Sequence, residues 1–75
     1  MKELVSYLAK ALVLHPEQVS VQEKDEYGAL HLQLNVAAED KGRIIGKQGR
    51  VIKAIRTLIQ ASGIQSHKKV SLELQ

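Results

Sequence analysis

The stretch Ile44-Ile45-Gly46-Lys47-Gln48-Gly49-Arg50-Val51-Ile52 decides the fold of this 75-residue chain. Its two glycines stand three positions apart, between two segments with helical patterns. Because glycine has no Cβ, the pair allows a very tight turn and lets another backbone come close. The second helix begins at this turn, so its free N–H groups point outward beside lysine and arginine side chains. We therefore expect the turn to hold phosphate, in a narrow cleft with aliphatic walls.

Helices are expected on both sides of this turn. A short helix over residues 39–45 begins with the acids Glu39-Asp40, and carboxylates are favourable at the positive end of a helix dipole. A longer helix over about residues 50–62 carries one apolar stripe, with basic residues on its far side. Gly63 is placed to close this helix in a left-handed C-cap. The stripe consists of Val51, Ile52, Ile55, Leu58 and Ile59.

Alternation of apolar and polar residues predicts three strands. The clearest is over residues 30–36, where leucines and a valine alternate with polar residues and put His31 on the polar face. Residues 18–25 form a strand with Val19 and Val21 facing inward. Its polar second half places this strand at the edge of a sheet. Residues 70–74 alternate in the same way and form the third strand.

The chain begins with an amphipathic helix over residues 2–14. Pro16 ends it, because the residue before a proline is pushed out of the helical region. Val13 and Leu14 fall off the apolar stripe, so they either pack at the helix end or stay exposed for a partner. The stripe itself consists of Leu4, Val5, Leu8, Ala11 and Leu12.

The predicted order of elements is α-β-β-α-α-β, an α+β fold in a single domain over residues 1–75. Three strands cannot cover both of their own faces, so the three helices should pack on one face of a three-stranded sheet. The first two strands form a hairpin. The third returns through a helical crossover and runs parallel to the second, so the sheet is expected to be mixed.

Charge is distributed unevenly along the chain. Of its 11 bases, six lie between Lys41 and Arg56, where there is no acid, and the rest of the chain carries all 8 acids and a net charge of −3. A basic block on an acidic body indicates an anion-binding face, and nucleic acid is the commonest such anion. Lys41 and Arg56 themselves are as consistent with plain solvation as with a contact.

Several classes of function are disfavoured. A P-loop needs glycines five positions apart, whereas Gly42 and Gly46 are one residue short of that, and Gln48 offers no hydroxyl for magnesium. The chain has no cysteine, its three histidines lack ligand spacing, and no nucleophile stands with a base. We therefore expect no metal, no cofactor, no small-molecule substrate and no catalysis. No apolar run approaches 18 residues, so we expect no membrane partner. A small domain that is stable without disulfides suits a reducing compartment, so we expect a cytoplasmic location.

The central stretch resembles the signature of the KH RNA-binding domain, which is an aliphatic pair, then G-x-x-G, then an aliphatic residue three positions later. Ile44-Ile45-Gly46-Lys47-Gln48-Gly49 followed by Ile52 fits it position by position. The order of elements looks like the type II, bacterial arrangement, and a free-standing domain of this size is similar to small bacterial KhpA-like proteins. The resemblance implies a non-enzymatic protein, an RNA chaperone or post-transcriptional regulator, that clamps about four nucleotides of single-stranded RNA by their backbone.

The resemblance and the bases around the loop define a predicted RNA-binding set, namely Gly46, Lys47, Gln48, Gly49, Arg43, Arg50, Ile45 and Lys53. Ile44, Ile52 and Ile55 are expected in the core instead. The resemblance also implies a homodimer, or a heterodimer with a larger KH-containing RNA-binding protein. The alternative function is a dimerising protein-interaction adaptor within a larger complex, in which the basic face is incidental.

Overall fold

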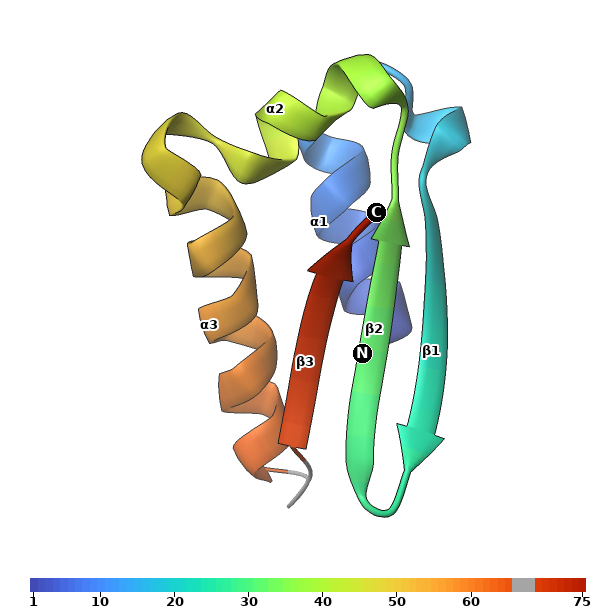
Figure 1. Cartoon of the computed structure of the whole chain (residues 1–75), viewed down its shortest axis with the longest axis vertical. Coiled ribbons are helices and arrows are strands. Elements are labelled where there is room, and N and C mark those ends of the chain that lie inside the picture. Colours follow the sequence, from blue (N-terminus) through green and yellow to red (C-terminus); the bar gives the residue numbers. More distant parts are fainter. Residues whose placement is uncertain (66–68) are drawn as a thin grey trace.

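The structure, a computed structural model, describes residues 1–65 and 69–75, and its elements follow the predicted order (Figure 1). The helices are α1 (Lys2–Leu12), α2 (Lys41–Ile45) and α3 (Arg50–Gln65). The strands are β1 (Ser20–Glu26), β2 (Ala29–Asn35) and β3 (Lys69–Leu74). Short 3₁₀ turns precede β1, α2 and α3, and they are η1 (Pro16–Gln18), η2 (Ala38–Asp40) and η3 (Lys47–Gly49).

The sheet has the order β1-β2-β3 and is mixed, as predicted. β1 pairs antiparallel with β2, with Val21 opposite Leu34. β2 pairs parallel with β3, with Leu32 opposite Leu72. The hairpin closes through Tyr27 and Gly28, both with positive φ (50° and 79°), which suits the right-handed twist of the two strands.

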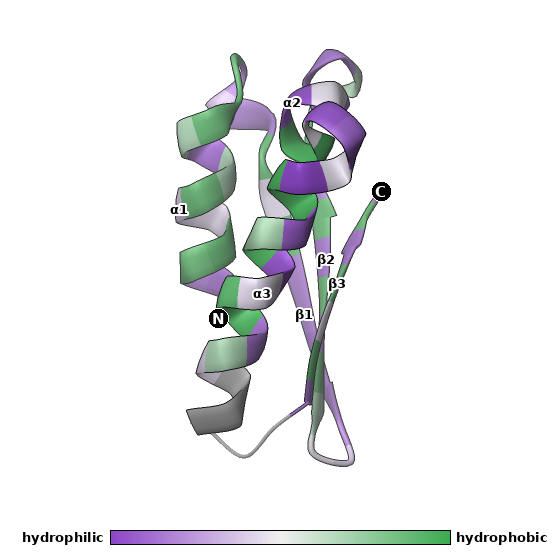
Figure 2. Ribbon diagram, turned by 90° about the vertical axis from the view of Figure 1, so that its left-hand side faces the viewer, coloured by the Kyte–Doolittle hydropathy of each residue, from purple (hydrophilic) through white to green (hydrophobic). Residues whose placement is uncertain are grey.

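The helices occupy one side of this sheet. Figure 2 shows α1 and α3 on the same face, and Figure 1 shows α2 crossing at the end of the layer where β2 ends. This arrangement leaves the opposite face of the sheet uncovered. That face carries the polar residues of the alternating strands, including His31 on β2 and Ser71 on β3.

The core lies between the helical layer and the sheet. The leucines of β2 are buried, as their alternation predicts, and Ile52, Ile55 and Ile59 cover them from α3. Ile44 of α2 is fully buried at the end of the layer. The predicted core positions of Ile44, Ile52 and Ile55 are therefore confirmed.

The buried face of α1 differs from the predicted stripe. Val5 and Ala9 are buried, whereas Leu4 and Leu12 are each more than a third exposed. Ala9 has almost no side chain, so the helix can lie close to the sheet along this line, and the larger leucines turn to its flanks. α1 ends at Leu12, two residues before the predicted end.

The end of α3 also corrects a prediction. The helix continues to Gln65, so Gly63 lies inside its last turn and does not act as the left-handed C-cap. Glycine inside a helix costs about 1 kcal/mol relative to alanine, which the rest of a 16-residue helix can offset. Leu58, predicted in the apolar stripe, is 53% exposed.

Candidate nucleic-acid interface

The turn between α2 and α3 needs glycine at its first position. Gly46 has φ 75° and ψ 176°, a conformation that is open almost only to glycine. A Cβ added there would lie 2.7 Å from Cβ of Val51, in the first turn of α3. The Gly46 N–H also donates to the Gly42 carbonyl at 2.8 Å and closes α2. The first glycine therefore lets the loop pack tightly on α3.

The second glycine has a different environment. Gly49 has φ 74°, but nothing lies within 4 Å of the place where its Cβ would be. Between the glycines, Gln48 is a non-glycine residue in the left-handed region, with φ 58° and ψ 26°. Such a residue carries backbone strain of about 1–3 kcal/mol, and strain of this kind is concentrated at ligand-binding sites. The outer side of the loop is thus open to a ligand that approaches the backbone.

Positive charge surrounds this open side. Lys47, Arg50 and Lys53 are exposed, and they follow one another from η3 into the first turns of α3. The Arg50 Nη2 donates to Gln48 Oε1 at 3.4 Å, which ties the two side chains of the loop together. Ile45, just before the loop, is 41% exposed and offers an apolar surface beside the charges.

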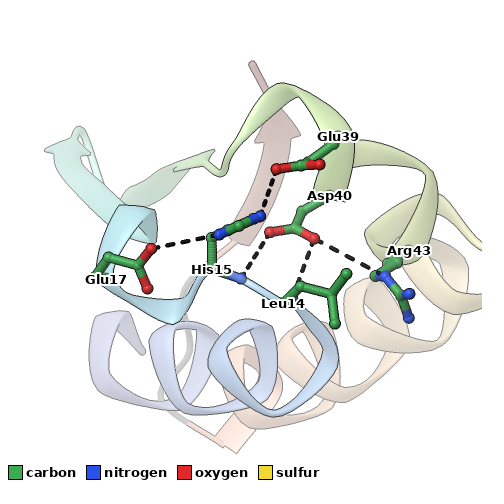
Figure 3. A network of polar contacts seen from close by, with 6 residues as sticks. All are labelled: Leu14, His15, Glu17, Glu39, Asp40 and Arg43. Carbon is green, nitrogen blue, oxygen red and sulfur yellow. Dashed lines mark hydrogen bonds and ion pairs between the residues drawn. The ribbon is translucent and has the colours of Figure 1, made fainter.

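Arg43 lies apart from the rest of the predicted set. It is two residues from Ile45 on α2, which is a rotation of about 200°, so the two side chains leave opposite flanks of the helix. The Arg43 Nε lies 3.9 Å from Oδ1 of Asp40, and the same oxygen accepts the N–H of Leu14 beyond the end of α1 (Figure 3). Arg43 and the loop residues therefore lie near the same short helix, α2, but on different sides of it.

Asp40 has a role that the sequence did not reveal. It was expected in the first turn of a helix, as a charge for the dipole, but its carboxylate is fully buried and accepts two distant N–H groups. Leu14 N–H donates to Oδ1 at 3.1 Å and His15 N–H donates to Oδ2 at 3.0 Å (Figure 3). Asp40 thus fastens the segment after α1 to the start of α2. No local pattern marks a contact across 26 residues.

Polar contacts of the His15 ring reinforce this junction. Its Nε2 meets Glu39 Oε1, and its Nδ1 lies 3.5 Å from Glu17 Oε1. Figure 3 shows the ring between the two glutamate carboxylates, beside the buried Asp40. The acids before α2 therefore hold the chain that leaves α1.

Arg56 is exposed but also contacts the fold. Its Nε donates to the carbonyl oxygen of Leu72 at 3.3 Å, which links α3 to β3. Sequence reasoning left Arg56 open between solvation and contact because the partner is a backbone atom of a distant strand. Only the packing of α3 beside β3 could reveal it.

The uncovered face of the sheet has a different chemistry from the loop. It holds a hollow of ≈ 660 Å³ whose charges are of both signs. Within it, Lys24 and Glu26 form an ion pair at 2.7 Å. The hydrogen bond from Lys24 lowers the pKa of Glu26 below its ordinary value. His31 and Ser71 are joined by a hydrogen bond of 2.7 Å. With three glutamates and one lysine in its lining, this face lacks the excess of positive charge found at the loop.

Over residues 1–65 and 69–75, no group of three or more histidine, cysteine or acidic side chains is placed to hold a metal ion. In the same part of the chain, no helix has the length and apolar character needed to cross a membrane.

Comparison with known proteins extends over nearly the whole chain. The chain is 50% identical over 74 residues to the RNA-binding protein KhpA of Clostridium perfringens, a match that covers 99% of both chains. It is 47% identical to the KhpA of Listeria monocytogenes, over 99% of this chain and 97% of the relative. It is 45% identical to the KhpA of Treponema pallidum, over 97% of this chain and 91% of the relative.

Among solved structures, a similar fold occurs in Era bound to MgGDPNP and a segment of 16S ribosomal RNA. The TM-score is 0.55 at 23% identity, and the match covers 97% of this chain and 28% of that one. This likeness shows a shared fold alone, and the KH domain family model confirms the predicted KH-like fold. The family model "KhpA/KhpB, KH domain" matches residues 2–74. The chain belongs to the KhpA/KhpB family of KH domains and, like them, is not an enzyme.

Proposed function

We propose that this protein binds single-stranded RNA at the loop between α2 and α3. The observation that carries the proposal is the open side of Gly49, where the backbone is accessible and exposed basic side chains lie on either side. Its relatives support the same function, since they are named RNA-binding proteins. A KH loop clamps about four nucleotides by their backbone, and a loop of this shape and charge suits that task.

The predicted residues divide the work according to their chemistry. Gly46 shapes the loop, and Gly49 lets a phosphate reach the N–H groups at the start of α3. Lys47 and Lys53 neutralise phosphates, Gln48 and Arg50 act as a linked pair of hydrogen-bonding side chains, and Ile45 contacts a base. Arg43 lies on the other flank of α2, paired with Asp40, and contributes positive charge farther from the loop.

In the cell we propose that the domain, as one unit over residues 1–75, acts as an RNA chaperone or post-transcriptional regulator in the cytoplasm. A grip on about four nucleotides is short, so one copy should bind with loose sequence preference. The overall affinity of such a regulator for RNA rises when several sites are linked, because the second binding event becomes intramolecular.

The direct test is a charge reversal in the loop. Lys47→Asp with Gln48→Asp should abolish binding of a short labelled RNA, because carboxylates at the phosphate site repel the backbone. Both side chains are exposed, so the melting temperature should change little. Lys2→Asp with Ser6→Asp makes the same change in charge on α1 and should leave binding nearly unchanged. Wild-type affinity in a folded loop variant would place the RNA site elsewhere.

A second function, docking of a protein partner, is favoured by the outer side of the helical layer. Leu4, Tyr7 and Ala11 form a stripe on α1 at spacings of three and four, Leu14 lies two residues beyond the helix end, and all four are exposed. Tyr7 is 73% exposed and Leu14 is 62% exposed, whereas Val13 packs against the core. We propose that this stripe joins two copies, or one copy and a larger KH-containing protein.

The docking function is tested by size. Tyr7→Glu should lower the mass measured by light scattering at micromolar concentration, and it should leave the melting curve of the monomer almost unchanged. Gln22→Glu makes the same change in charge on the uncovered face of the sheet and serves as the control. A wild-type protein that is monomeric alone and with every KH-containing partner tested would remove this function.

A further inference from the structure

The six basic residues between Lys41 and Arg56 fall into two groups in the structure. Each of the three arginines meets an acceptor of the protein: Arg43 meets Asp40, Arg50 meets Gln48, and Arg56 meets the Leu72 carbonyl. The side chains of the three lysines have no hydrogen bond or ion pair with the described residues, and these are Lys41, Lys47 and Lys53. The lysines can therefore follow a moving strand, whereas each arginine is drawn toward an acceptor of the protein.

Arg56 is the arginine whose anchor belongs to the fold itself. Its acceptor is a backbone oxygen of a strand residue, Leu72, whose side chain is 4% exposed, so the anchor cannot move without the sheet. A guanidinium is planar, and once Nε is held, the plane of its remaining N–H donors is set as well. Among the described residues, Leu72 is the one hydrogen-bond partner of the Arg56 side chain. The outer donors of the fork remain available.

The position of Arg56 suits a nucleotide that follows the loop. Arg50 and Lys53 leave α3 on the side away from the buried isoleucines. Arg56 leaves α3 about 120° from Arg50, on the flank that meets β3. Arg56 lies six residues beyond Arg50, which is about 9 Å along the helix axis. A strand clamped at the loop and laid along this side would pass Lys53 and then reach the edge of β3 at Arg56.

We propose that Arg56 is a specificity-determining residue, which reads a base that presents two adjacent acceptors, with guanine preferred. This inference rests on the proposed binding of RNA at the loop. A phosphate needs only nearby positive charge, which the unanchored Lys47 and Lys53 supply. A fixed, planar pair of donors instead matches the O6 and N7 acceptors of guanine, and adenine offers a donor in place of O6.

The test compares affinity across sequences and salt concentrations. Short labelled adenine oligomers, each with a single guanine at a different position, are titrated beside the all-adenine oligomer. Wild type should prefer the best-placed guanine by about tenfold. Arg56→Lys keeps the charge but loses the fork, so the preference should fall to about one while the dependence on salt stays unchanged. Arg56 is exposed, so the folded state should survive, and a melting curve checks this.

Lys53→Gln is the matched control, one turn earlier on the same side of α3. It should weaken all oligomers in the same proportion, keep the preference for guanine, and make the slope of log affinity against log salt shallower by about 0.7. Arg56→Gln provides a second variant. If it behaves like Lys53→Gln, Arg56 is a phosphate contact and the inference is wrong.

The inference and the proposed function fail in different ways. A wild-type protein that binds none of the oligomers would contradict RNA binding at the loop. A wild-type protein that binds all of them equally, or an Arg56→Lys variant that keeps the preference, would overturn the role of Arg56 and leave RNA binding intact.

Discussion

Gly46 lies so close to Val51 that no side chain fits between them. A Cβ on Gly46 would lie 2.7 Å from Cβ of Val51 and 3.0 Å from its main-chain nitrogen. Gly49, three residues on, has open space at the same position. The two glycines of one motif therefore serve different purposes, since the first shapes the loop and the second leaves room for a ligand.

We predict that Gly46→Ala and Gly49→Ala destabilise the protein unequally. Gly46→Ala should cost about 3 kcal/mol in free energy of unfolding, because the first turn of α3 must move away from the new methyl group. Gly49→Ala should cost about 1 kcal/mol, the ordinary cost of a left-handed alanine. Urea unfolding curves measure both values. Equal losses would show that the contact with Val51 relaxes without cost.

The buried carboxylate of Asp40 should be among the most sensitive positions in the chain. Asp40→Ala leaves the N–H groups of Leu14 and His15 without their acceptor, at a cost of about 2–4 kcal/mol. Glu39→Ala, at the exposed neighbour that contacts the His15 ring, should cost less than about 1 kcal/mol. Urea unfolding distinguishes the two. A small loss of free energy of unfolding for Asp40→Ala would mean that water replaces the carboxylate as the acceptor.

Ile55 and Leu58 should respond differently to charge, although both belong to the apolar stripe of α3. Ile55→Asp buries an unpaired carboxylate and should unfold the domain, which thermal melting would show. Leu58→Asp places the charge on a side chain that is 53% exposed and should leave the fold intact. An unchanged melting temperature for Ile55→Asp would show that this part of the helix is not packed.

Binding of RNA should depend on salt to a modest degree. A grip on about four nucleotides touches about two to four phosphates, and each contributes about 0.7 to the slope for a single strand. The expected slope of log affinity against log salt is therefore about −1.5 to −3. A matching RNA duplex should bind more weakly than the single strand. A slope near zero, or equal affinity for the duplex, would count against the loop as a phosphate site.

The parts of the fold that were predictable from the sequence are those that depend on local pattern. Alternation in Leu30-Leu32-Leu34 indicates the central strand, and the two glycines of the loop indicate the turn between helices. The missed features depend on contacts across the chain. Asp40 reaches residues 25 and 26 positions away, and Arg56 reaches a carbonyl 16 positions away. The face of α1 that contacts the sheet is centred on Ala9, and this could not be predicted because it depends on how the helix packs against the sheet.

The candidate site shows the same division. The residues of the loop could be named in sequence because their role follows from a short motif. Their directions could not, because a rotation of α2 separates Arg43 from Ile45 and the packing of α3 beside β3 determines the plane of Arg56. A motif therefore identifies which residues can contact a ligand, and tertiary structure determines how each one meets it.

The two outer strands of the sheet are protected from aggregation by different means. β1 carries four consecutive charged residues, Glu23, Lys24, Asp25 and Glu26, and charge on an exposed edge discourages a second chain from pairing there. On β3, Arg56 occupies the Leu72 carbonyl, which an added strand would need for its own hydrogen bond. Charged side chains guard one edge of the three-stranded sheet and a side-chain hydrogen bond guards the other, so each edge disfavours pairing with a second chain.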